Sequence, residues 1–81
     1  MKLTVYGPGC AKCKKAEEIA HEAVAQAGVE AEVEKVSDII DIAKAGVIMT
    51  PAVAIDGEIV ARGKVPKLDE LVSLITSAQA G

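Results

Sequence analysis

The segment Lys2–Cys13, KLTVYGPGCAKC, sets the beginning of the fold. Apolar and polar residues alternate over residues 2–6, which is the two-residue period of a β-strand. The Gly-Pro-Gly of residues 7–9 then interrupts this strand. From residue 11 to residue 27 apolar side chains recur every three or four positions, the pattern of an amphipathic helix. The segment therefore predicts a strand, a tight loop and a helix that begins directly after Cys10.

The remainder of the chain predicts three further strands and two further helices. Gly28 is suited to end the first helix, and Asp56-Gly57 is a strong signal for a two-residue hairpin turn because both residues tolerate positive φ. We expect the tail, residues 77–81, to fray. The further elements expected are a strand over 29–36, a helix over 38–45, strands over 52–55 and 58–62, and a helix over 66–76.

This order of elements predicts one α/β domain over residues 1–81. The order is β-α-β-α-β-β-α, with no linker and no internal repeat. A βαβ unit implies a parallel crossover, whereas the hairpin is antiparallel. We therefore expect a four-stranded mixed sheet with helices on both faces.

Composition and charge exclude several partners. The chain has a formal net charge of -3, no Trp, no Phe and a single Tyr, so a basic footprint and aromatic stacking on bases are both missing. No stretch approaches the roughly 18 apolar residues of a membrane span. We expect no nucleic-acid partner and no membrane partner. The N-terminus lacks the apolar region of a secretory signal, so we expect a cytoplasmic protein.

Cys10 and Cys13 are the candidate reactive residues. In a reducing compartment such a pair is more often catalytic, redox-sensing or metal-binding than structural. Residues three apart in a first helical turn lie on one face, within the roughly 4.4–6.8 Å between Cα atoms that a disulfide requires. The unpaired N–H groups at a helix start favour thiolate over thiol at Cys10. A purely structural disulfide that closes so short a loop would stabilise the folded state by only about 2 kcal/mol. The spacing favours redox chemistry.

Three cations follow the first cysteine: Lys12, Lys14 and Lys15. Positive charge in the first turn opposes the helix macrodipole, and residues that are locally unfavourable in this way can indicate a function. One hypothesis is that Lys12 helps to hold Cys10 as a thiolate. The other is that these lysines form only a solvated face.

Two segments carry a family resemblance, Tyr6–Cys13 and Met49–Glu58. With the order of elements around them, they resemble the thioredoxin superfamily, most closely the small redox-active disulfide proteins of archaea and bacteria. The resemblance implies a thioredoxin-like fold in which Pro51 is a cis proline facing the disulfide and Thr50 offers main-chain groups to a substrate. We also expect Gly9 and Met49 to line the substrate site.

The resemblance further implies the activity, a thiol–disulfide exchange. Cys10 would be the nucleophile and Cys13 the resolving thiol, with no cofactor beyond the redox-active disulfide itself. Implied partners are proteins that contain disulfides, and a reductase of the thioredoxin-reductase type as electron donor. The chain departs from the family at Gly9, where thioredoxin has Trp. It also departs at residues 63–65, Gly-Lys-Val, where glutaredoxins have Gly-Gly-Asp.

Two other interpretations use the same residues. A soft-metal carrier also places Cys-x-x-Cys at a helix start, and two thiolates suit Cu(I). The chain offers one further candidate ligand, His21, which is more simply an exposed helix residue. The hairpin preceded by Thr50-Pro51 distinguishes this chain from the fold of such metal carriers. The third interpretation is a regulatory binding module with an idle thiol pair, in which Met49 and Ala52 would form an apolar rim.

Overall fold

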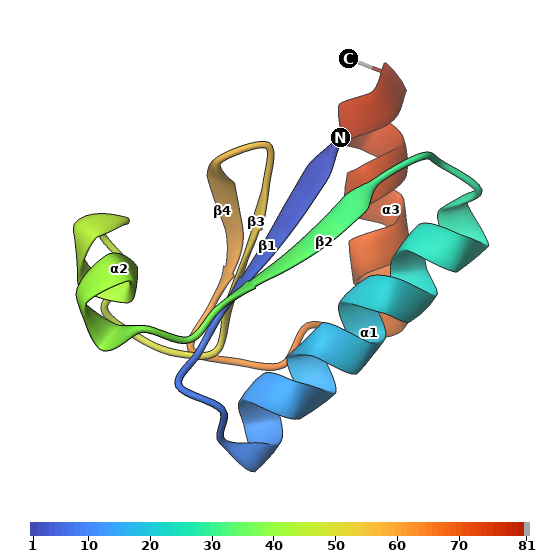
Figure 1. Ribbon diagram of the computed structural model, residues 1–81. Helices are drawn as coiled ribbons and strands as arrows, with labels where there is room; N and C mark the ends of the chain where they lie inside the picture. Colours follow the sequence, from blue (N-terminus) through green and yellow to red (C-terminus); the bar gives the residue numbers. More distant parts are fainter. Residues whose placement is uncertain (81) are drawn as a thin grey trace.

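The computed structural model describes residues 1–80; Gly81 lies outside the described residues. Seven elements follow one another in the predicted order (Figure 1). The strands are β1 (Lys2–Tyr6), β2 (Glu32–Val36), β3 (Ala52–Ile55) and β4 (Glu58–Arg62). The helices are α1 (Ala11–Ala27), α2 (Ile39–Lys44) and α3 (Leu68–Ala80).

The four strands form one mixed sheet in the order β2-β1-β3-β4. β1 pairs in parallel with β2, and it pairs antiparallel with β3, which continues into β4 through the hairpin. Asp56 and Gly57 in the hairpin turn have φ values of 49° and 88°, as the sequence predicted. α1 and α3 lie on one side of the sheet and α2 lies on the other (Figure 1). The expected α/β class and the mixed sheet with helices on both faces are confirmed.

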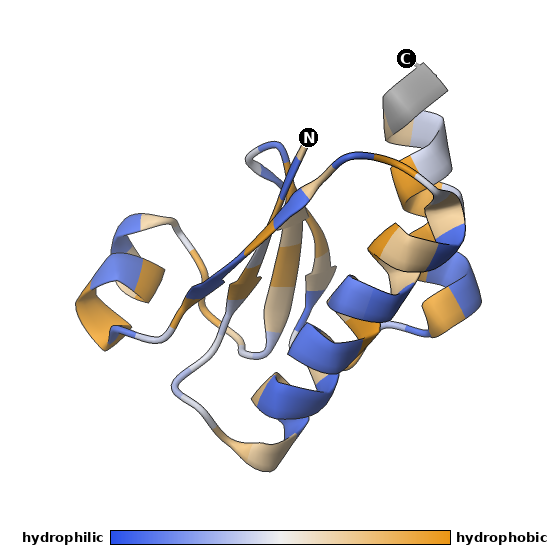
Figure 2. Cartoon of the chain, turned by 45° about the vertical axis from the view of Figure 1, so that its right-hand side comes forward, coloured by the Kyte–Doolittle hydropathy of each residue, from blue (hydrophilic) through white to orange (hydrophobic). Residues whose placement is uncertain are grey.

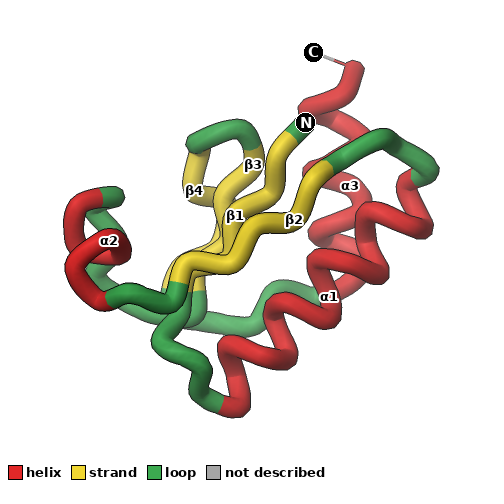
Figure 3. The backbone as a smooth tube through the Cα atoms, in the orientation of Figure 1, coloured by secondary structure: helices red, strands yellow, loops and turns green. Residues whose placement is uncertain are grey.

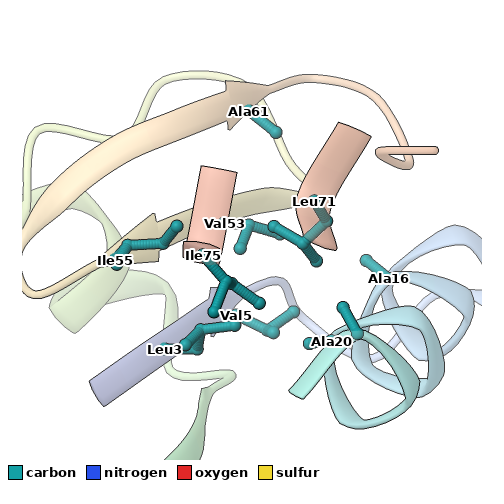
Figure 4. Packing of buried hydrophobic residues seen from close by; sticks show 10 residues of the cluster. Leu3, Val5, Ala16, Ala20, Val53, Ile55, Ala61, Leu71 and Ile75 are labelled. Atoms are coloured by element: carbon teal, nitrogen blue, oxygen red, sulfur yellow. The ribbon is translucent and has the colours of Figure 1, made fainter. Parts of the chain in front are cut away.

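The main core fills the space between the sheet and the pair α1 and α3. Leu3 and Val5 point into it from β1, and Leu71 and Ile75 meet them from α3 (Figure 4). α1 contributes small residues here, so α1 and α3 approach closely and contact each other. The fully buried members of this cluster are Leu3, Val5, Ala16, Ala20, Ala23, Val53, Leu71 and Ile75.

The second face of the sheet has a much smaller core. Ile42, Val47 and Ala52 form its buried centre, with partly buried residues from β1, β2 and β4 packed around them. α2 stands at one end of the molecule and leaves hydrophobic segments at the surface (Figure 2). This face is therefore only partly covered.

β2 is shorter than predicted. The sequence suggested a strand over 29–36, but the strand begins at Glu32. The Lys2 end of β1 pairs with Glu32, and the Glu32 N–H donates to the Met1 carbonyl at 3.0 Å, so the preceding residues have no strand beside them. Val29 and Ala31 still pack against the main core. Their alternation reflects burial without the hydrogen-bonded ladder that defines a strand.

The bounds of two helices also differ from the prediction. α2 covers Ile39–Lys44 rather than 38–45, because Asp38 is its N-cap, accepting a hydrogen bond from the Ile40 N–H at 2.8 Å. α3 begins at Leu68 rather than at residue 66, since its first bond runs from the Leu71 N–H to the Lys67 carbonyl. It continues to Ala80, past the predicted end at 76. Neither Gly nor Pro, the two residues with the lowest helix propensity, occurs between Leu68 and Ala80.

Within residues 1–80, none of the helices is both long enough and apolar enough to cross a membrane.

Candidate active site

Three loops meet at one end of the sheet (Figure 3). They are the loop from β1 to α1 with residues 7–10, the loop before β3 with residues 45–51, and the loop after β4 with residues 63–67. The Gly63 N–H donates to the Pro51 carbonyl at 2.9 Å, which ties the last two loops together. Cys10 and Cys13 lie at this end of the molecule, at the start of α1.

Cys10 is the N-cap of α1 and is exposed. Its backbone is extended, with φ −69° and ψ 169°, and its Sγ accepts a hydrogen bond from the Cys13 N–H at 3.3 Å. A side-chain hydrogen bond with Cys13 lowers the pKa of the Cys10 thiol, and the backbone amides of Cys13 and Lys12 lower it further. No acidic residue lies in the first turn to oppose this effect. The helix start thus holds an accessible sulfur that ionises readily.

Cys13 is fully buried, in contrast to Cys10. Burial raises the pKa of the Cys13 thiol, and the hydrogen bond to Cys10 and the negative charge of Cys10 raise it further. Both thiols are free, and the two residues are in direct hydrogen-bonding contact. The pair is therefore asymmetric: the Cys10 sulfur is exposed with a lowered pKa, and the Cys13 sulfur is buried with a raised pKa.

Lys12 is exposed at the helix start. Within the described part of the chain the ion pairs join Lys2 to Glu34 and Lys35 to Glu17, so none of them involves Lys12. Its contribution to the lowered pKa of Cys10 comes from its backbone amide. The hypothesis that its ammonium group tunes Cys10 stays a prediction.

The Thr50-Pro51 peptide bond is cis, as the resemblance implied. In the antiparallel pairing of β1 with β3, Tyr6 lies opposite Ala52. Pro51 directly precedes Ala52, so it lies at the end of the sheet where β1 leads into the loop that carries Cys10. Pro51 is fully buried and Thr50 is partly exposed. Thr50 and Pro8 line the same groove. The structure thus brings the Thr50-Pro51 loop beside the loop that carries Cys10.

Gly9 and Met49 are placed differently from each other. Gly9 has φ 97° in open surroundings, so it provides a turn and free space next to Cys10. Met49 is 62% exposed and its side chain lies over Gly63. It lines a second groove, with Ile59 and Arg62, on the β4 side of the Thr50-Pro51 loop. The structure therefore places Met49 at the rim, one residue before Thr50.

An exposed apolar surface adjoins the site. We call it the α2 patch: Ile39, Ile40, Ile48 and Met49, with exposures of 71%, 65%, 95% and 62%. A groove of about 220 Å³ connects the α2 patch with the active site, because Ile39 and Ile48 line it together with Pro8 and Thr50. Large apolar side chains exposed next to one another are typical of interaction sites.

Gly7 is a site residue that the sequence analysis missed. In the sequence Gly7 is only the first residue of the Gly-Pro-Gly loop that ends β1. In the structure Gly7 is buried directly against the side chain of Cys13. No local signal in the sequence separates this glycine from Gly9, because the contact depends on how α1 packs onto the end of β1.

Over the part of the chain that the structure describes, the metal-carrier interpretation gains no third ligand near the thiols. Among residues 1–80, no group of three His, Cys, Asp or Glu side chains is arranged to hold a metal ion. His21 is exposed on α1, more than two turns after Cys13. The order of elements and the cis Thr50-Pro51 bond also differ from the βαββαβ arrangement of heavy-metal-associated domains.

A dithiol at a helix start, beside a cis-proline loop at the end of a four-stranded mixed sheet, defines a thioredoxin-like disulfide oxidoreductase. Comparison with known proteins agrees with this class. A family model described as "Thioredoxin domain" matches residues 1–76. The chain belongs to the thioredoxin family.

Two curated relatives cover almost the whole chain. The chain is 38% identical over 76 residues to a thioredoxin of Methanothermobacter thermautotrophicus, an alignment that covers 94% of this chain and 99% of that protein. It is also 38% identical over 79 residues to a thioredoxin of Methanocaldococcus jannaschii, covering 98% of this chain and 91% of the relative. Thiol–disulfide exchange is the activity of the family.

Proposed function

We propose that Cys10 and Cys13 reduce disulfides of partner proteins, with Cys10 as nucleophile and Cys13 as resolving thiol. The observation that carries this assignment is the asymmetry of the pair. Cys10 is exposed with a lowered pKa, whereas Cys13 is buried with a raised pKa. Attack requires a thiolate that the substrate can reach, and only Cys10 meets both conditions.

In the first step the Cys10 thiolate attacks one sulfur of the substrate disulfide. The substrate S–S bond breaks, a mixed disulfide forms at Cys10, and the other substrate sulfur leaves as a thiolate that takes up a proton. Cys10 then no longer carries a negative charge. Two of the effects that raise the pKa of Cys13, its hydrogen bond to Cys10 and the charge of Cys10, are thereby removed. Attack at Cys10 thus prepares Cys13 for the second step.

In the second step Cys13 loses its proton and its thiolate attacks Cys10 Sγ. The bond between Cys10 and the substrate breaks, the second substrate sulfur leaves, and the Cys10–Cys13 disulfide forms. The substrate has gained two electrons and two protons, and the cysteine pair has lost two electrons, the Cys13 proton and the proton that Cys10 released when it ionised. The pair itself carries the electrons, so the proposal needs no other cofactor. A reductase of the thioredoxin-reductase type would restore the dithiol, which fits a cytoplasmic location.

The surroundings of Cys10 support proteins as substrates. Thr50 and Pro8 border the groove that leads to the α2 patch, which offers apolar contacts well beyond the size of a small disulfide. Thr50 precedes β3 and leaves main-chain groups next to the site for an extended substrate segment. Partner side chains next to the disulfide would be buried in this groove, and their burial would contribute to binding.

Trapping of the mixed disulfide tests the two roles. Cys13→Ser should accumulate a covalent adduct with a protein disulfide such as insulin, visible by mass spectrometry under non-reducing conditions. The matched variant Cys10→Ser should form none, because its remaining thiol is buried. An adduct with Cys10→Ser, or no adduct with folded Cys13→Ser, would contradict the assignment. Titration of the reduced wild-type protein with Cu(I) tests the metal-carrier alternative in parallel.

A further inference from the structure

The space next to Cys13 is available only because residue 7 has no side chain. A Cβ atom built on Gly7 would lie 2.3 Å from the Cys13 Sγ and 2.7 Å from the Cys13 Cβ. Non-bonded carbon and sulfur atoms do not approach this closely, since interiors are already packed at the density of organic crystals. The Cys13 side chain therefore occupies the volume that any side chain at residue 7 would need.

Neither backbone is free to move away from this contact. The Gly7 N–H donates to the Val36 carbonyl at 2.9 Å, extending the pairing of β1 with β2 by one residue. Cys13 lies within α1, and Ala16 and Ala20 on the same helix face are fully buried in the main core. The sheet and the helix thus hold the two residues together from opposite sides.

Glycine is required at residue 7 because there is no space for a side chain, and not because the backbone has a positive φ. Gly9, Gly28, Gly46, Gly57 and Gly63 have positive φ, and Gly7 does not. The φ of Gly7 therefore lies outside the left-handed region that disfavours alanine. At Gly9 and Gly28 the situation is reversed, because nothing lies within 4 Å of a Cβ built there.

We propose that Gly7 is the positioning residue for the resolving thiol: the missing side chain at residue 7 is what allows the Cys13 sulfur to be buried at the start of α1. A side chain here would force the sulfur out of its pocket or displace the first turn of α1. Burial of Cys13 would then decrease. The consequence for catalysis rests on the proposed function, in which Cys13 must reach Cys10 Sγ to release the substrate.

Alkylation of Cys13 tests the proposal without relying on catalysis. In a Cys10→Ser background only Cys13 can react with iodoacetamide, and its burial should make the reaction slow. Adding Gly7→Ala should raise the rate by about tenfold or more, because a buried thiol reacts only when it becomes accessible. Adding Gly28→Ala is the matched control: it costs backbone strain at positive φ but touches nothing near Cys13, so the rate should change little. An unchanged rate with Gly7→Ala would overturn the proposal.

A stability measurement keeps the test decisive if Gly7→Ala folds poorly. Combining Gly7→Ala with Cys13→Gly removes both close contacts and should restore much of the lost stability, whereas Gly28→Ala with Cys13→Gly should show no such rescue. Equal losses from Gly7→Ala in the two backgrounds would overturn the proposal.

The mixed disulfide separates this inference from the proposed function. With both cysteines present, Gly7→Ala should prolong the adduct with insulin compared with wild type. If Cys13→Ser traps the adduct but Gly7→Ala changes neither alkylation nor adduct lifetime, only the role of Gly7 is refuted. If Cys13→Ser traps nothing while Gly7→Ala still exposes Cys13, the proposed function is refuted and the packing role remains.

Discussion

The two faces of the sheet differ in how completely they are covered. On one face α1 and α3 enclose a core with many fully buried side chains, including Leu71 and Ile75. On the other face the six-residue α2 buries only Ile42 well and leaves the α2 patch in solvent. The closed face accounts for most of the stability, because burial of apolar area is the main favourable term in folding. The open face leaves apolar surface that continues, along the groove lined by Pro8 and Thr50, toward the loop that carries Cys10.

The largest expected effect is on stability and should appear only on the closed face. Leu71→Ala removes a fully buried side chain and should lower the free energy of unfolding by about 2–5 kcal/mol. Ile48→Ala, at a side chain that is 95% exposed, should stay within about 0.5 kcal/mol of wild type. Urea unfolding followed by circular dichroism measures both. Similar losses for the two variants would show that α2 and its loop pack more tightly than the structure indicates.

The next effect is on substrate choice and should appear only on the open face. Ile48→Glu places a charge in the α2 patch and should lower kcat/KM for a protein disulfide by about tenfold, since a charge cannot be buried there without a partner. The loss for a small disulfide should be distinctly less. Leu74→Glu on α3 is the matched control, because Leu74 is also exposed, at 39%, but lies outside the α2 patch. Equal losses for both substrates would remove the α2 patch from the docking surface.

A smaller effect concerns the cysteine pair at the start of α1. Cys13→Ala removes the side-chain hydrogen bond that is the largest cause of the lowered pKa of Cys10. The pKa of Cys10 should rise, so its alkylation rate should begin to fall at a higher pH as the solution is acidified. The pH profile of iodoacetamide alkylation measures this shift. A profile that does not move would mean that the backbone amides alone hold Cys10 as a thiolate.

The smallest effect is expected for Lys12. Its side chain is exposed, and salt screens charges in solvent. Lys12→Glu should therefore move the alkylation profile of Cys10 by less than Cys13→Ala does, in the direction of a higher pKa. Lys44→Glu at the end of α2 is a control for the same change in net charge. A shift with Lys12→Glu as large as that with Cys13→Ala would establish the ammonium group as a true contributor.

Much of the fold and the cysteine pair could be predicted, because local rules determine them. The two-residue alternation of residues 2–6, the three-to-four-residue period of α1 and the Asp56-Gly57 turn all correspond to elements of the structure. The cis state of the Thr50-Pro51 bond came from the family resemblance and not from local rules. The alternation of apolar and polar residues predicted a strand at residues 29–31 where there is none. Burial on one face and strand pairing produce the same alternation, but only pairing makes a strand.

The sequence by itself determined the order of elements, the class of fold and the two sulfurs at a helix start, since each depends on neighbours within a few positions along the chain. Only the tertiary structure decided that Cys13 is buried while Cys10 is exposed, that Gly7 must leave room for the Cys13 side chain, and that the α2 patch adjoins the site. These features arise where β1, α1 and the loop before β3 meet. Contacts between residues distant in sequence depend on packing, which no local pattern encodes.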